Sequence, residues 1–509
     1  MKETILFGKN NLSNMGSLKL KDLFQSVSGA KIHGEEKLIP SRIVTDSRRV
    51  EPGSLFFAIP GFKNDGLDYI EQAIDRGALA VVSEVELSLG CRVPYIHVRN
   101  SREALASVAK VFYKSPDLRL KTIGITGTNG KTSVSLLCQS IINGSYKAGL
   151  IGTIHYDLGA RTIPSYRTTP ESVDIFRMLS DMIDSNCSHA IMEVSSHGLD
   201  QSRVKGIDFD VVVFMNLTHE HLDYHKDMDE YYDVKRKLFI NPKGIPSAKL
   251  SIVNIDDLYG EKLHQELIQK RANVVSFGES ENADLQVREI DLYSDRSAFT
   301  LTWKQEQIRV HSSLVGRYNV DNWMAAAMVG VSQEMTLQEV ESLLANFHGV
   351  PGRLQPVEND LNLSILVDYA HTPEALKYAL ETVRQICQGR LLVVFGCGGN
   401  RDKSKRELMT QRVAEISDLA WATSDNPRRE KIDAIFSDMQ KAPSWKGNIE
   451  FVEDRRHAIR LAIENCKDED FLVIAGKGHE TFQEVGTTVI PFDDVQVARE
   501  ILRARKLLL

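Results

Sequence analysis

The chain has 509 residues, of which 42% are hydrophobic and 26% are charged. This balance, with 33 glycines and 15 prolines, excludes collagen-like, low-complexity and largely disordered proteins. The formal net charge of −7 gives no general attraction for polyanions, so we expect no nucleic-acid partner, and an anionic ligand needs local basic groups.

The cysteine content and the hydropathy of the sequence indicate in which cellular compartment the protein is expected. The six cysteines include no C-x-x-C pair, which argues against a disulfide framework and a structural zinc site. No apolar stretch approaches the roughly 20 residues that cross a bilayer, and the N-terminus lacks the apolar core of a secretory signal. We therefore expect a cytoplasmic protein without membrane insertion.

Length and patterning predict an α/β protein of three domains, since a domain averages roughly 150 residues. The first domain is placed at residues 1–119, where a Pro52-Gly53 turn precedes the apolar run Leu55 to Ile59. Short β-branched runs alternate with helical patterns along the whole chain, as they do in parallel α/β units.

Predicted strands define the other two domains. The second domain, residues 120–349, begins with the strand KTIGI (121–125), and its later runs AIMEV (190–194) and VVVFMN (211–216) are continuously apolar, which is typical of buried parallel strands. The third domain, residues 350–509, has the runs LSILVDYA (363–370), RLLVVFG (390–396) and DFLVIAG (470–476) and a helical stretch at 374–386. We expect the third domain to be doubly wound and Rossmann-like.

A phosphate-binding loop follows the first strand of the second domain. The segment TGTNGKT is followed by helix-compatible sequence, so backbone N–H groups and a helix N-terminus would cradle an anion. Lys131 would contact the β- and γ-phosphates of ATP, and the Thr132 hydroxyl would bind Mg²⁺. The match is to the shorter form G-x-x-G-K-T, because Ile125 stands where the longer pattern has glycine. The residues of the loop are Thr126, Gly127, Thr128, Asn129, Gly130, Lys131 and Thr132.

Further metal ligands are expected where neighbouring strands end. Glu193 ends one apolar strand, and the segment THEHLDYH follows another, with His221 as a candidate second Mg²⁺ ligand. A second function class stays open here, because His219, His221, Asp223 and His225 superficially resemble the H-x-H-x-D group of zinc metallohydrolases. The zinc interpretation leaves the phosphate loop without a function. Measuring the zinc content of the protein and the dependence of its activity on Mg²⁺ and ATP would distinguish the two function classes.

The motifs taken together resemble the Mur ligase family, and their order is similar to the members that add the third residue of the peptidoglycan stem peptide. The motifs that carry the resemblance are DSRRVEPGSLFFAIPG (46–61), TGTNGKT, RTTPE (167–171), MEVSSHGLDQSRV (192–204), NLTHEHLDYH (216–225), YYDVKRKLF (231–239), GRYNVDN (316–322), VPGR (350–353), VDYAHTPEAL (367–376), FGCGGNRDKSKR (395–406), TSDNPR (423–428) and AGKGHE (475–480).

The resemblance implies an N-terminal domain for UDP, a central ATPase domain and a C-terminal domain for the amino acid. It also implies an Mg²⁺- and ATP-dependent ligase acting on UDP-N-acetylmuramoyl-L-alanyl-D-glutamate. In this family ATP phosphorylates the D-Glu γ-carboxylate, and the incoming amine attacks the acyl phosphate. Catalysis then consists mainly of positioning and charge neutralisation. A monomer is expected. A homologue that binds nucleotide but has lost the ligase chemistry remains the alternative.

The resemblance also assigns individual residues. Lys235 matches a lysine that is modified to a carbamate and binds Mg²⁺. Asn319, Asp368 and Arg353 match contacts to the base, ribose and phosphate of ATP. The positions that match contacts to the UDP-muramoyl dipeptide are Ser47, with the loop Phe62 to Asn64, and Thr168, Thr169, Ser195, Gln201 and Arg203. The positions that match the amino-acid pocket are Arg401, Asp425, Asn426, Pro427, Arg428, Gly476 and Glu480.

The chain departs from the family pattern at three positions: Asn400 and Glu220 each replace an aspartate, and Gln355 replaces an acidic residue.

The segment DNPR bears on the choice of amino acid. A guanidinium pairs bidentately with a carboxylate and repels a bare ammonium, so Arg428 favours meso-diaminopimelate over L-lysine, with Glu480 pairing the distal amine. L-lysine or another diamino acid remains the alternative. The same segment also fits a helix N-terminus, with Asn426 as N-cap and Pro427 at the first helical position.

Overall fold

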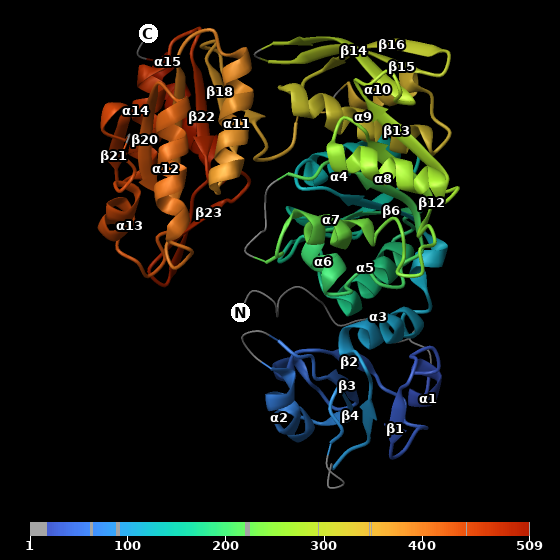
Figure 1. The fold of residues 1–509 in the computed structure, drawn as a ribbon. Helices are drawn as coiled ribbons and strands as arrows, with labels where there is room; N and C mark the ends of the chain where they lie inside the picture. Colours follow the sequence, from blue (N-terminus) through green and yellow to red (C-terminus); the bar gives the residue numbers. More distant parts are fainter. Residues whose placement is uncertain are drawn as a thin grey trace. The chain divides into compact units, whose positions relative to one another are not determined.

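A computed structural model describes residues 18–61, 65–87, 92–218, 224–293, 295–345, 347, 349–443 and 445–507. The described chain forms two compact units (Figure 1). The first unit comprises Met1–Asp284 with Ala325–Glu334, and the second comprises Leu285–Met324 with Met335–Leu509. The chain passes from one unit to the other within helix α9, Arg317–Val331. No helix among the described residues is long and apolar enough to cross a bilayer.

The first unit begins with a five-stranded sheet in the order β1-β5-β4-β3-β2, in which only β1 is antiparallel to its neighbour. Its strands are β1 Lys31–His33, β2 Arg42–Val44, β3 Ser54–Phe57, β4 Ala78–Ser83 and β5 Tyr95–His97. Its helices are α1 Leu20–Leu23, α2 Ile70–Asp75 and α3 Ser101–Phe112, with 3₁₀ turns at η2 Ser47–Arg49, η3 Gly66–Tyr69 and η4 Pro116–Arg119.

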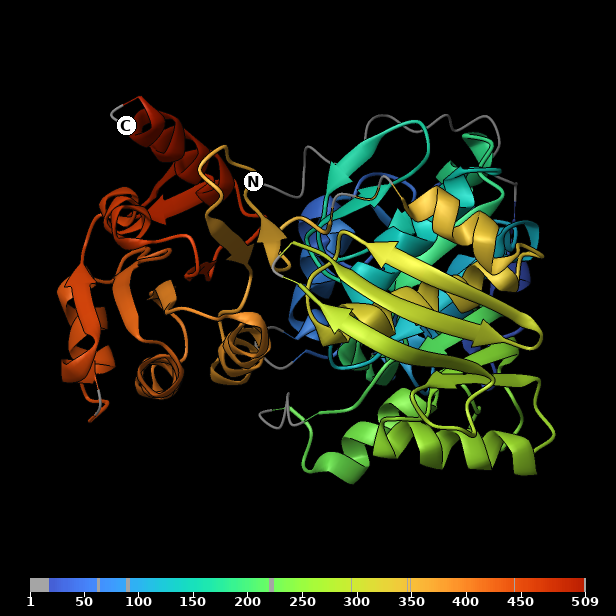
Figure 2. The same cartoon turned by 90° about the horizontal axis from the view of Figure 1, so that it is seen from above.

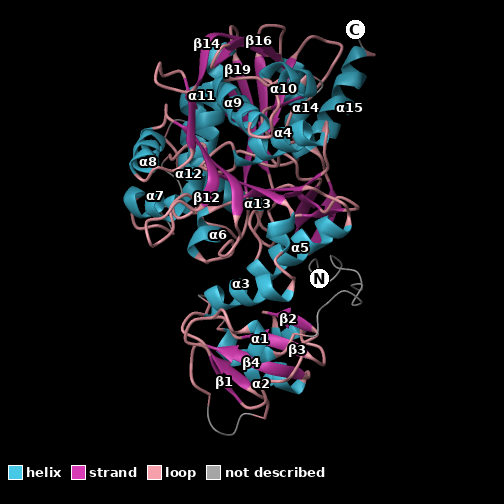
Figure 3. Cartoon of the chain, turned by 90° about the vertical axis from the view of Figure 1, so that its right-hand side faces the viewer, coloured by secondary structure: helices cyan, strands magenta, loops and turns pink. Residues whose placement is uncertain are grey.

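Successive residues of β3 face opposite sides of this sheet, so both sides are buried. Leu55 and Phe57 pack in the core that includes α1 and α3, whereas Phe56 packs with α2. Helix α3 lies between the sheet and α5, Ser172–Asp184 (Figure 3). The parallel α/β pattern predicted for this part of the chain is therefore confirmed.

The rest of the first unit is built on eight strands in the order β13-β12-β11-β6-β10-β7-β8-β9. The strands from β13 to β7 are parallel, and β8 and β9 are antiparallel. The strands are β6 Lys121–Thr126, β7 Ala148–Ile151, β8 His155–Asp157, β9 Thr162–Pro164, β10 His189–Glu193, β11 Phe209–Phe214, β12 Ala248–Asn254 and β13 Val274–Gly278. The further helices are α4 Lys131–Asn143, α6 Ser196–Asp200, α7 Met228–Arg236 and α8 Leu258–Gln269.

The three apolar runs of the second predicted domain are the adjacent strands β10, β6 and β11 at the centre of this sheet. They are buried on both faces, which explains their lack of polar alternation. Because the strands are parallel, their carboxyl ends meet at one edge. The phosphate loop after β6, Glu193 at the end of β10 and Asn216 just beyond β11 all lie at that edge.

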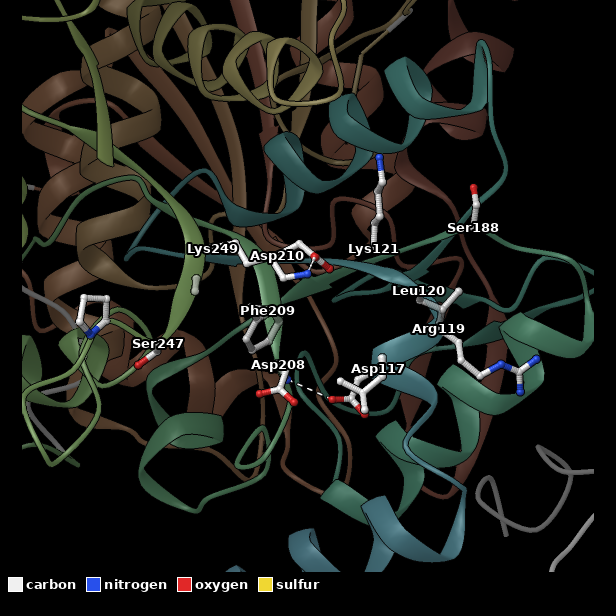
Figure 4. A pocket seen from close by; sticks show the side chains of 13 residues that line it. Asp117, Arg119, Leu120, Lys121, Ser188, Asp208, Phe209, Asp210, Ser247 and Lys249 are labelled. Atoms are coloured by element: carbon white, nitrogen blue, oxygen red, sulfur yellow. Dashed lines mark hydrogen bonds and ion pairs between the residues drawn. The ribbon is translucent and has the colours of Figure 1, made fainter. Parts of the chain in front are cut away.

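A hollow of about 630 Å³ lies at the opposite, amino end of the same strands. Figure 4 shows its lining, with Lys121 at the start of β6 and Phe209 at the start of β11. Two aspartates that line this hollow already have partners within the chain. Asp210 accepts a hydrogen bond from Thr122 N (2.7 Å) and forms an ion pair with Lys249 (2.6 Å), and Asp208 forms an ion pair with Lys110 (2.7 Å). None of the site residues predicted from the sequence lines it.

The second unit opens with a three-stranded antiparallel sheet, visible in Figure 2. Its strands are β14 Leu285–Leu292, β15 Ser297–Trp303 and β16 Glu306–Ser312, and α10 Leu337–Leu344 follows α9. These three strands were not predicted from the sequence.

A six-stranded sheet completes the second unit, in the order β17-β18-β22-β19-β20-β21. All its pairs are parallel except β17 with β18. The strands are β17 Gln355–Pro356, β18 Ser364–Asp368, β19 Leu391–Cys397, β20 Leu419–Ser424, β21 Ile449–Val452 and β22 Phe471–Ala475, with a hairpin of β23 Phe482–Val485 and β24 Thr488–Pro491. The helices are α11 Pro373–Ile386, α12 Ser404–Ile416, α13 Ile432–Met439, α14 Arg455–Asn465 and α15 Asp494–Lys506, with a 3₁₀ turn at η5 Trp445–Gly447.

Helices cover both faces of this sheet, as the doubly wound prediction requires. Val393 and Phe395 of β19 pack with α11 and α12, and Leu392 and Val394 pack with α14 and α15. The predicted strands and the predicted helix at 374–386 are therefore confirmed to within a few residues.

Candidate active site

The phosphate loop has a defined backbone shape. Gly130 is the N-cap of α4 with φ +87°, a left-handed conformation that glycine adopts without strain. Gly127 approaches its neighbours closely, since a Cβ there would lie 2.8 Å from the Met215 Cβ. Asn216 anchors the loop from the end of β11, because its main-chain oxygen accepts from the Thr128 amide (2.9 Å) and its Oδ1 accepts from the Asn129 amide (2.9 Å).

Helix α4 presents an anion-binding N-terminus directly after this loop. Its first intrahelical hydrogen bond runs from Val134 N to Gly130 O (2.9 Å), so the amides before Val134 have no acceptor within the helix. The Lys131 ammonium group lies at the loop itself, 2.8 Å from both the Gly127 and the Thr128 carbonyl oxygens. This arrangement is suited to a polyphosphate.

Glu193 is a buried carboxylate beside the loop, with 1% of its surface exposed. It accepts hydrogen bonds from the Thr132 hydroxyl (2.9 Å), the Thr153 amide (2.8 Å) and the Thr153 hydroxyl (2.9 Å). Among the described residues no lysine or arginine forms an ion pair with it. A buried anion next to a hydroxyl oxygen offers the hard oxygen ligands that Mg²⁺ prefers, so these two side chains fit the metal that the sequence resemblance implies.

Four of the residues predicted to contact the UDP-muramoyl dipeptide form one hydrogen-bonded group around Thr169: Thr169 itself, Ser195, Gln201 and Arg203. The Thr169 hydroxyl donates to Glu193 O (2.8 Å) and accepts from the Ser195 amide (3.0 Å). Arg203 donates to Thr169 O (2.8 Å) and to Gln201 Oε1 (2.6 Å).

The Thr168 hydroxyl connects this group to the carboxylate that contacts the phosphate loop. It is 3.0 Å from the Thr153 hydroxyl, which in turn donates to Glu193. Ser195 also caps α6, since its hydroxyl accepts from Gly198 N (3.1 Å). Ser47 lies in the N-terminal sheet region, where its hydroxyl donates to Gln72 (2.5 Å).

Lys235 projects from α7 to the same loop and is 1% exposed. Its ammonium group donates to Gly127 O at 2.9 Å and lies 4.8 Å from the centre of the Tyr231 ring. The Gly127 carbonyl thus accepts from the ammonium groups of both Lys131 and Lys235. The Tyr231 hydroxyl is 3.2 Å from that of Thr128, so α7 supports the loop at two points.

Several predicted residues lie outside the described part of the chain: His219, Glu220, His221, Asp223 and the loop Phe62 to Asn64. His225 is described, and its buried ring stacks on Tyr231 with centroids 4.9 Å apart. The described residues contain no cluster of three or more metal-binding side chains. Three members of the predicted zinc group, His219, His221 and Asp223, lie outside the described residues, so the zinc prediction is not tested here.

The predicted nucleotide contacts Asn319, Arg353 and Asp368 belong to the second unit. Asp368 ends β18, and its carboxylate accepts from the amides of Leu354 (2.7 Å) and Ala370 (2.8 Å). Burial raises the pKa of Asp368, and the nearby Arg353 opposes that rise. The Asn319 side chain donates to Val315 O (2.8 Å) at the start of α9.

The predicted amino-acid pocket lies at the carboxyl ends of β20 and β22 in the second unit. Asn426 donates to Glu480 Oε2 (2.9 Å), and the fully buried Lys477 donates to the same oxygen (3.0 Å). Asp425 is also buried, and Gly476 leaves room for it, because a Cβ at Gly476 would lie 2.8 Å from Asp425 Oδ2. Glu480 is therefore paired within the chain, while its Oε1 has no hydrogen-bond partner among the described residues.

Arg428 is held by the β23–β24 hairpin. Its Nε donates to Glu484 Oε2 (2.7 Å) and its Nη1 donates to Gly399 O (2.9 Å), while its main chain pairs with Glu484 and Gly486. Arg401 is exposed and makes no hydrogen bond or ion pair with another residue that the structure describes.

The expectation that DNPR begins a helix was wrong. The next helix, α13, starts at Ile432 with Lys431 as its N-cap. Asn426 uses its side chain on Glu480 and on the Glu484 amide instead, so tertiary contacts determine the conformation here. Pro427 precedes Arg428, which has a left-handed backbone (φ +53°).

Five residues that shape these groups were not predicted from the sequence: Thr153, Asn216, Tyr231, Lys477 and Glu484. Asn216, Tyr231 and Lys477 fall inside motifs that the resemblance already uses, so a signal was present for them. Thr153 and Glu484 lie outside all quoted motifs, and only the fold brings them to their partners.

Three family models match successive parts of the chain. They are described as Mur ligase family, catalytic domain (residues 41–113), Mur ligase middle domain (125–330), and Mur ligase, glutamate ligase domain (352–478). The match to three Mur ligase domains agrees with the predicted fold class.

Individual proteins extend this comparison over nearly the whole chain. A UDP-N-acetylmuramoyl-L-alanyl-D-glutamate–2,6-diaminopimelate ligase from Geobacillus thermodenitrificans is 40% identical over 496 residues, covering 96% of this chain and 100% of the relative. A solved structure of a ligase with the same name has a TM-score of 0.70 at 30% identity, covering 96% of this chain and all of that chain. The MurF ligase from Thermotoga maritima in complex with ADP shares the fold, with a TM-score of 0.59 at 18% identity over 91% of this chain and 98% of that one. The chain belongs to the Mur ligase family.

Proposed function

We propose that the chain is an ATP-dependent ligase that joins meso-diaminopimelate to the D-Glu γ-carboxylate of UDP-N-acetylmuramoyl-L-alanyl-D-glutamate. Such a step extends a peptidoglycan precursor by its third amino acid. The name of the Geobacillus relative supports this substrate pair.

One observation carries the proposal. Glu193 links the phosphate loop to the predicted acceptor residues, because its carboxylate accepts from Thr132 and its main-chain oxygen accepts from Thr169. A side branch from Glu193 reaches Thr168 through Thr153. The transfer of a phosphoryl group from ATP to a carboxylate requires these two sites to be neighbours.

The residues of the first unit would divide the first half-reaction between them. The α4 N-terminus and Lys131 hold the β- and γ-phosphates, and Thr132 and Glu193 hold Mg²⁺, which when bound neutralises charge on the phosphates. A γ-carboxylate oxygen of the acceptor attacks the γ-phosphorus, and ADP leaves. The amine of the amino acid then attacks the acyl carbon, phosphate leaves, and the nitrogen releases a proton.

We propose that Lys235 carries a carbamate, as the family resemblance implies. The ammonium groups of the buried Lys235 and the partly buried Lys131 contact the single carbonyl of Gly127 and repel each other. Carbamylation replaces one of these cations with an anion whose oxygens suit Mg²⁺. His221 is a further proposed metal ligand.

In the second unit, Arg428 would pair with the distal carboxylate of diaminopimelate and Glu480 Oε1 with its distal amine. The contacts of Arg428 support this role. Its Nε donates to Glu484 and its Nη1 donates to Gly399 O, while its Nη2 has no acceptor among the described residues and could donate to a ligand. L-lysine lacks the second carboxylate and would leave the Nη2 group of Arg428 without an acceptor. Asp425, Asn426, Pro427, Gly476 and Arg401 complete the proposed pocket.

The finer assignments follow the same proposal. Residues 1–119 with Ser47 would bind UDP, residues 120–349 would bind ATP, and residues 350–509 would bind the amino acid. Asn319, Arg353 and Asp368 would contact the nucleotide. The enzyme would act as a cytoplasmic monomer, because both co-substrates that carry nucleotides occur there and one chain supplies every proposed site residue.

Phosphate release tests the function. Purified protein is incubated with ATP, Mg²⁺ and the UDP-muramoyl dipeptide, and amino acids are added singly. We expect phosphate release that requires all components, with meso-diaminopimelate at least tenfold better in kcat/KM than L-lysine. Release with equal efficiency from L-lysine would contradict the amino-acid assignment. Absence of release with every amino acid would contradict the ligase function.

A further inference from the structure

Three arginines surround one glutamate beside the proposed acceptor site. The Glu171 carboxylate lies 2.6 Å from Arg167, 3.3 Å from Arg203 and 3.7 Å from Arg102. We call these four residues the arginine cluster. Its members come from separate elements, because Arg102 is on α3, Arg167 and Glu171 lie between β9 and α5, and Arg203 follows α6. The cluster carries two more positive charges than negative ones.

This excess charge is partly removed from water. The exposed fraction of the side chain is 10% for Arg203, 18% for Glu171 and 27% for Arg102. Desolvation lowers the pKa of Arg203, and repulsion from Arg167 and Arg102 adds to that effect while Glu171 opposes it. A second anion at the cluster would relieve this repulsion.

The arginine cluster is also hydrogen-bonded to the residues that link the phosphate loop to the predicted acceptor contacts. Arg203 donates to Thr169 O (2.8 Å), and Thr169 donates to Glu193 O (2.8 Å). Arg167 immediately precedes Thr168, which contacts Thr153. An anion held by the arginines would therefore sit close to the residues that are predicted to contact the acceptor.

We propose that Arg102 and Arg167 complete, with Arg203, a guanidinium subsite for the α-carboxylate of the acceptor's D-Glu residue. This inference rests on the proposed function. D-Glu has two carboxylates separated by three carbons, and only the γ-carboxylate reacts. A subsite that grips the α-carboxylate presents the other one to ATP, so the arginine cluster would determine which carboxylate is activated. The diphosphate of UDP is the other oxyanion in the acceptor, and it lies farther from the reacting end.

The test compares two acceptors that differ only at this group. One is UDP-N-acetylmuramoyl-L-alanyl-D-glutamate, and the other carries D-isoglutamine, in which the α-carboxylate is a neutral amide. The protein is studied as wild type, as the double variant Arg102→Gln with Arg167→Gln, and as Arg102→Lys with Arg167→Lys. Arg161→Gln is the matched control, because Arg161 pairs with Asp181 (3.1 Å) outside the cluster. Calorimetry measures the Kd of each acceptor, and turnover gives KM and kcat.

We expect the wild type to bind the acid at least tenfold more tightly than the amide. The double glutamine variant should lose at least tenfold in affinity for the acid and less than twofold for the amide, with the KM for ATP unchanged. The lysine variant should recover part of the affinity for the acid, and Arg161→Gln should match the wild type. A parallel loss for acid and amide would overturn the proposal.

Binding of UDP alone is measured in the same way, to test whether the arginine cluster binds the diphosphate instead. If the double glutamine variant binds UDP as weakly, relative to wild type, as it binds the full acceptor, then the cluster binds the diphosphate and the proposal is wrong. Because binding is measured without turnover, these results are distinguishable from failure of the ligase function, which would appear as tight acceptor binding by wild type without phosphate release.

Discussion

Lys235 and Lys131 illustrate how much depends on single side chains at the phosphate loop. Both donate to the Gly127 carbonyl oxygen, yet Lys131 begins α4 and Lys235 lies near the end of α7. The loop therefore concentrates positive charge where ATP brings negative charge. Their proposed roles differ, since Lys131 acts as a cation and Lys235 as a carbamate anion.

The carbamate is tested by chemical rescue. Lys235→Ala should lose nearly all turnover, and formate or acetate should restore part of it, because the missing group is an anion at the metal. Added alkylamines should restore none. Lys237→Ala, two residues away with its side chain 47% exposed, should keep wild-type rates. Rescue by amines without rescue by carboxylates would rule out the carbamate.

The departure at Asn400 has a structural explanation. Asn400 has φ +52°, a conformation that asparagine tolerates well, and its Oδ1 accepts from the Arg429 amide (3.0 Å). Its own amide donates to Glu430 (2.9 Å), whose carboxylate also pairs with the fully buried Arg406. An aspartate at 400 would bring a second negative charge next to Glu430, whereas asparagine does not.

Glu430 gives a prediction about acid stability. The Arg406 hydrogen bonds hold its pKa below the ordinary value of 4.5, so its contribution is complete above about pH 4.5 and declines as the pH falls further. Glu430→Gln should destabilise the protein by about 2 kcal/mol at pH 7, and the difference should shrink below pH 4.5. Denaturant unfolding at several pH values measures this, with the exposed Glu407→Gln as control. A difference that stays constant down to pH 3 would refute the assignment.

At the scale of elements, the β23–β24 hairpin acts as a support for the amino-acid pocket. Gln483 donates to Asp425 O (2.7 Å), the Glu484 amide donates to Asn426 Oδ1 (2.9 Å), and Arg428 pairs with the hairpin through main chain and side chain. The hairpin thus fixes the backbone of DNPR in a conformation that no local sequence preference would impose.

Glu484 should influence how well Arg428 holds its ligand. Glu484→Ala removes the acceptor of Arg428 Nε, so the guanidinium loses its orientation, and the KM for meso-diaminopimelate should rise about tenfold with little change in kcat. Glu484→Gln should give a smaller rise, because the amide oxygen still accepts. Thr488→Ala, on the exposed strand β24, serves as the control. An unchanged KM for meso-diaminopimelate in Glu484→Ala would contradict the proposed role of Glu484 in orienting Arg428.

The elements that could be predicted from the sequence are those with strong local signals. Strands β10, β11, β19 and β22 appear in the sequence as largely apolar runs because both faces are buried, and the loop before α4 matches G-x-x-G-K-T. Contacts between distant residues carry no such signal. Thr153 lies 40 residues from the Glu193 carboxylate that it contacts, and Glu484 lies 56 residues from Arg428, so their roles emerge only in the fold.

On the scale of the whole molecule, three Mur ligase domains are matched along the chain, while the fold divides into two compact units. The N-terminal sheet and the ATP-binding sheet belong to one unit because a shared core, with α3 against α5, joins them. The predicted acceptor residues and the phosphate loop both lie in this unit. The central claim about the molecule is that this unit transfers phosphate from ATP to the acceptor's γ-carboxylate.

Isotope transfer tests that claim most directly. The acceptor is prepared with ¹⁸O in both oxygens of the D-Glu γ-carboxylate, and the enzyme turns it over with ATP, Mg²⁺ and meso-diaminopimelate. An acyl phosphate requires one labelled oxygen to leave with the phosphate when the amine attacks. We expect one ¹⁸O atom in each phosphate released, measured by mass spectrometry, and the other in the new amide. Unlabelled phosphate formed together with the amide product would contradict it.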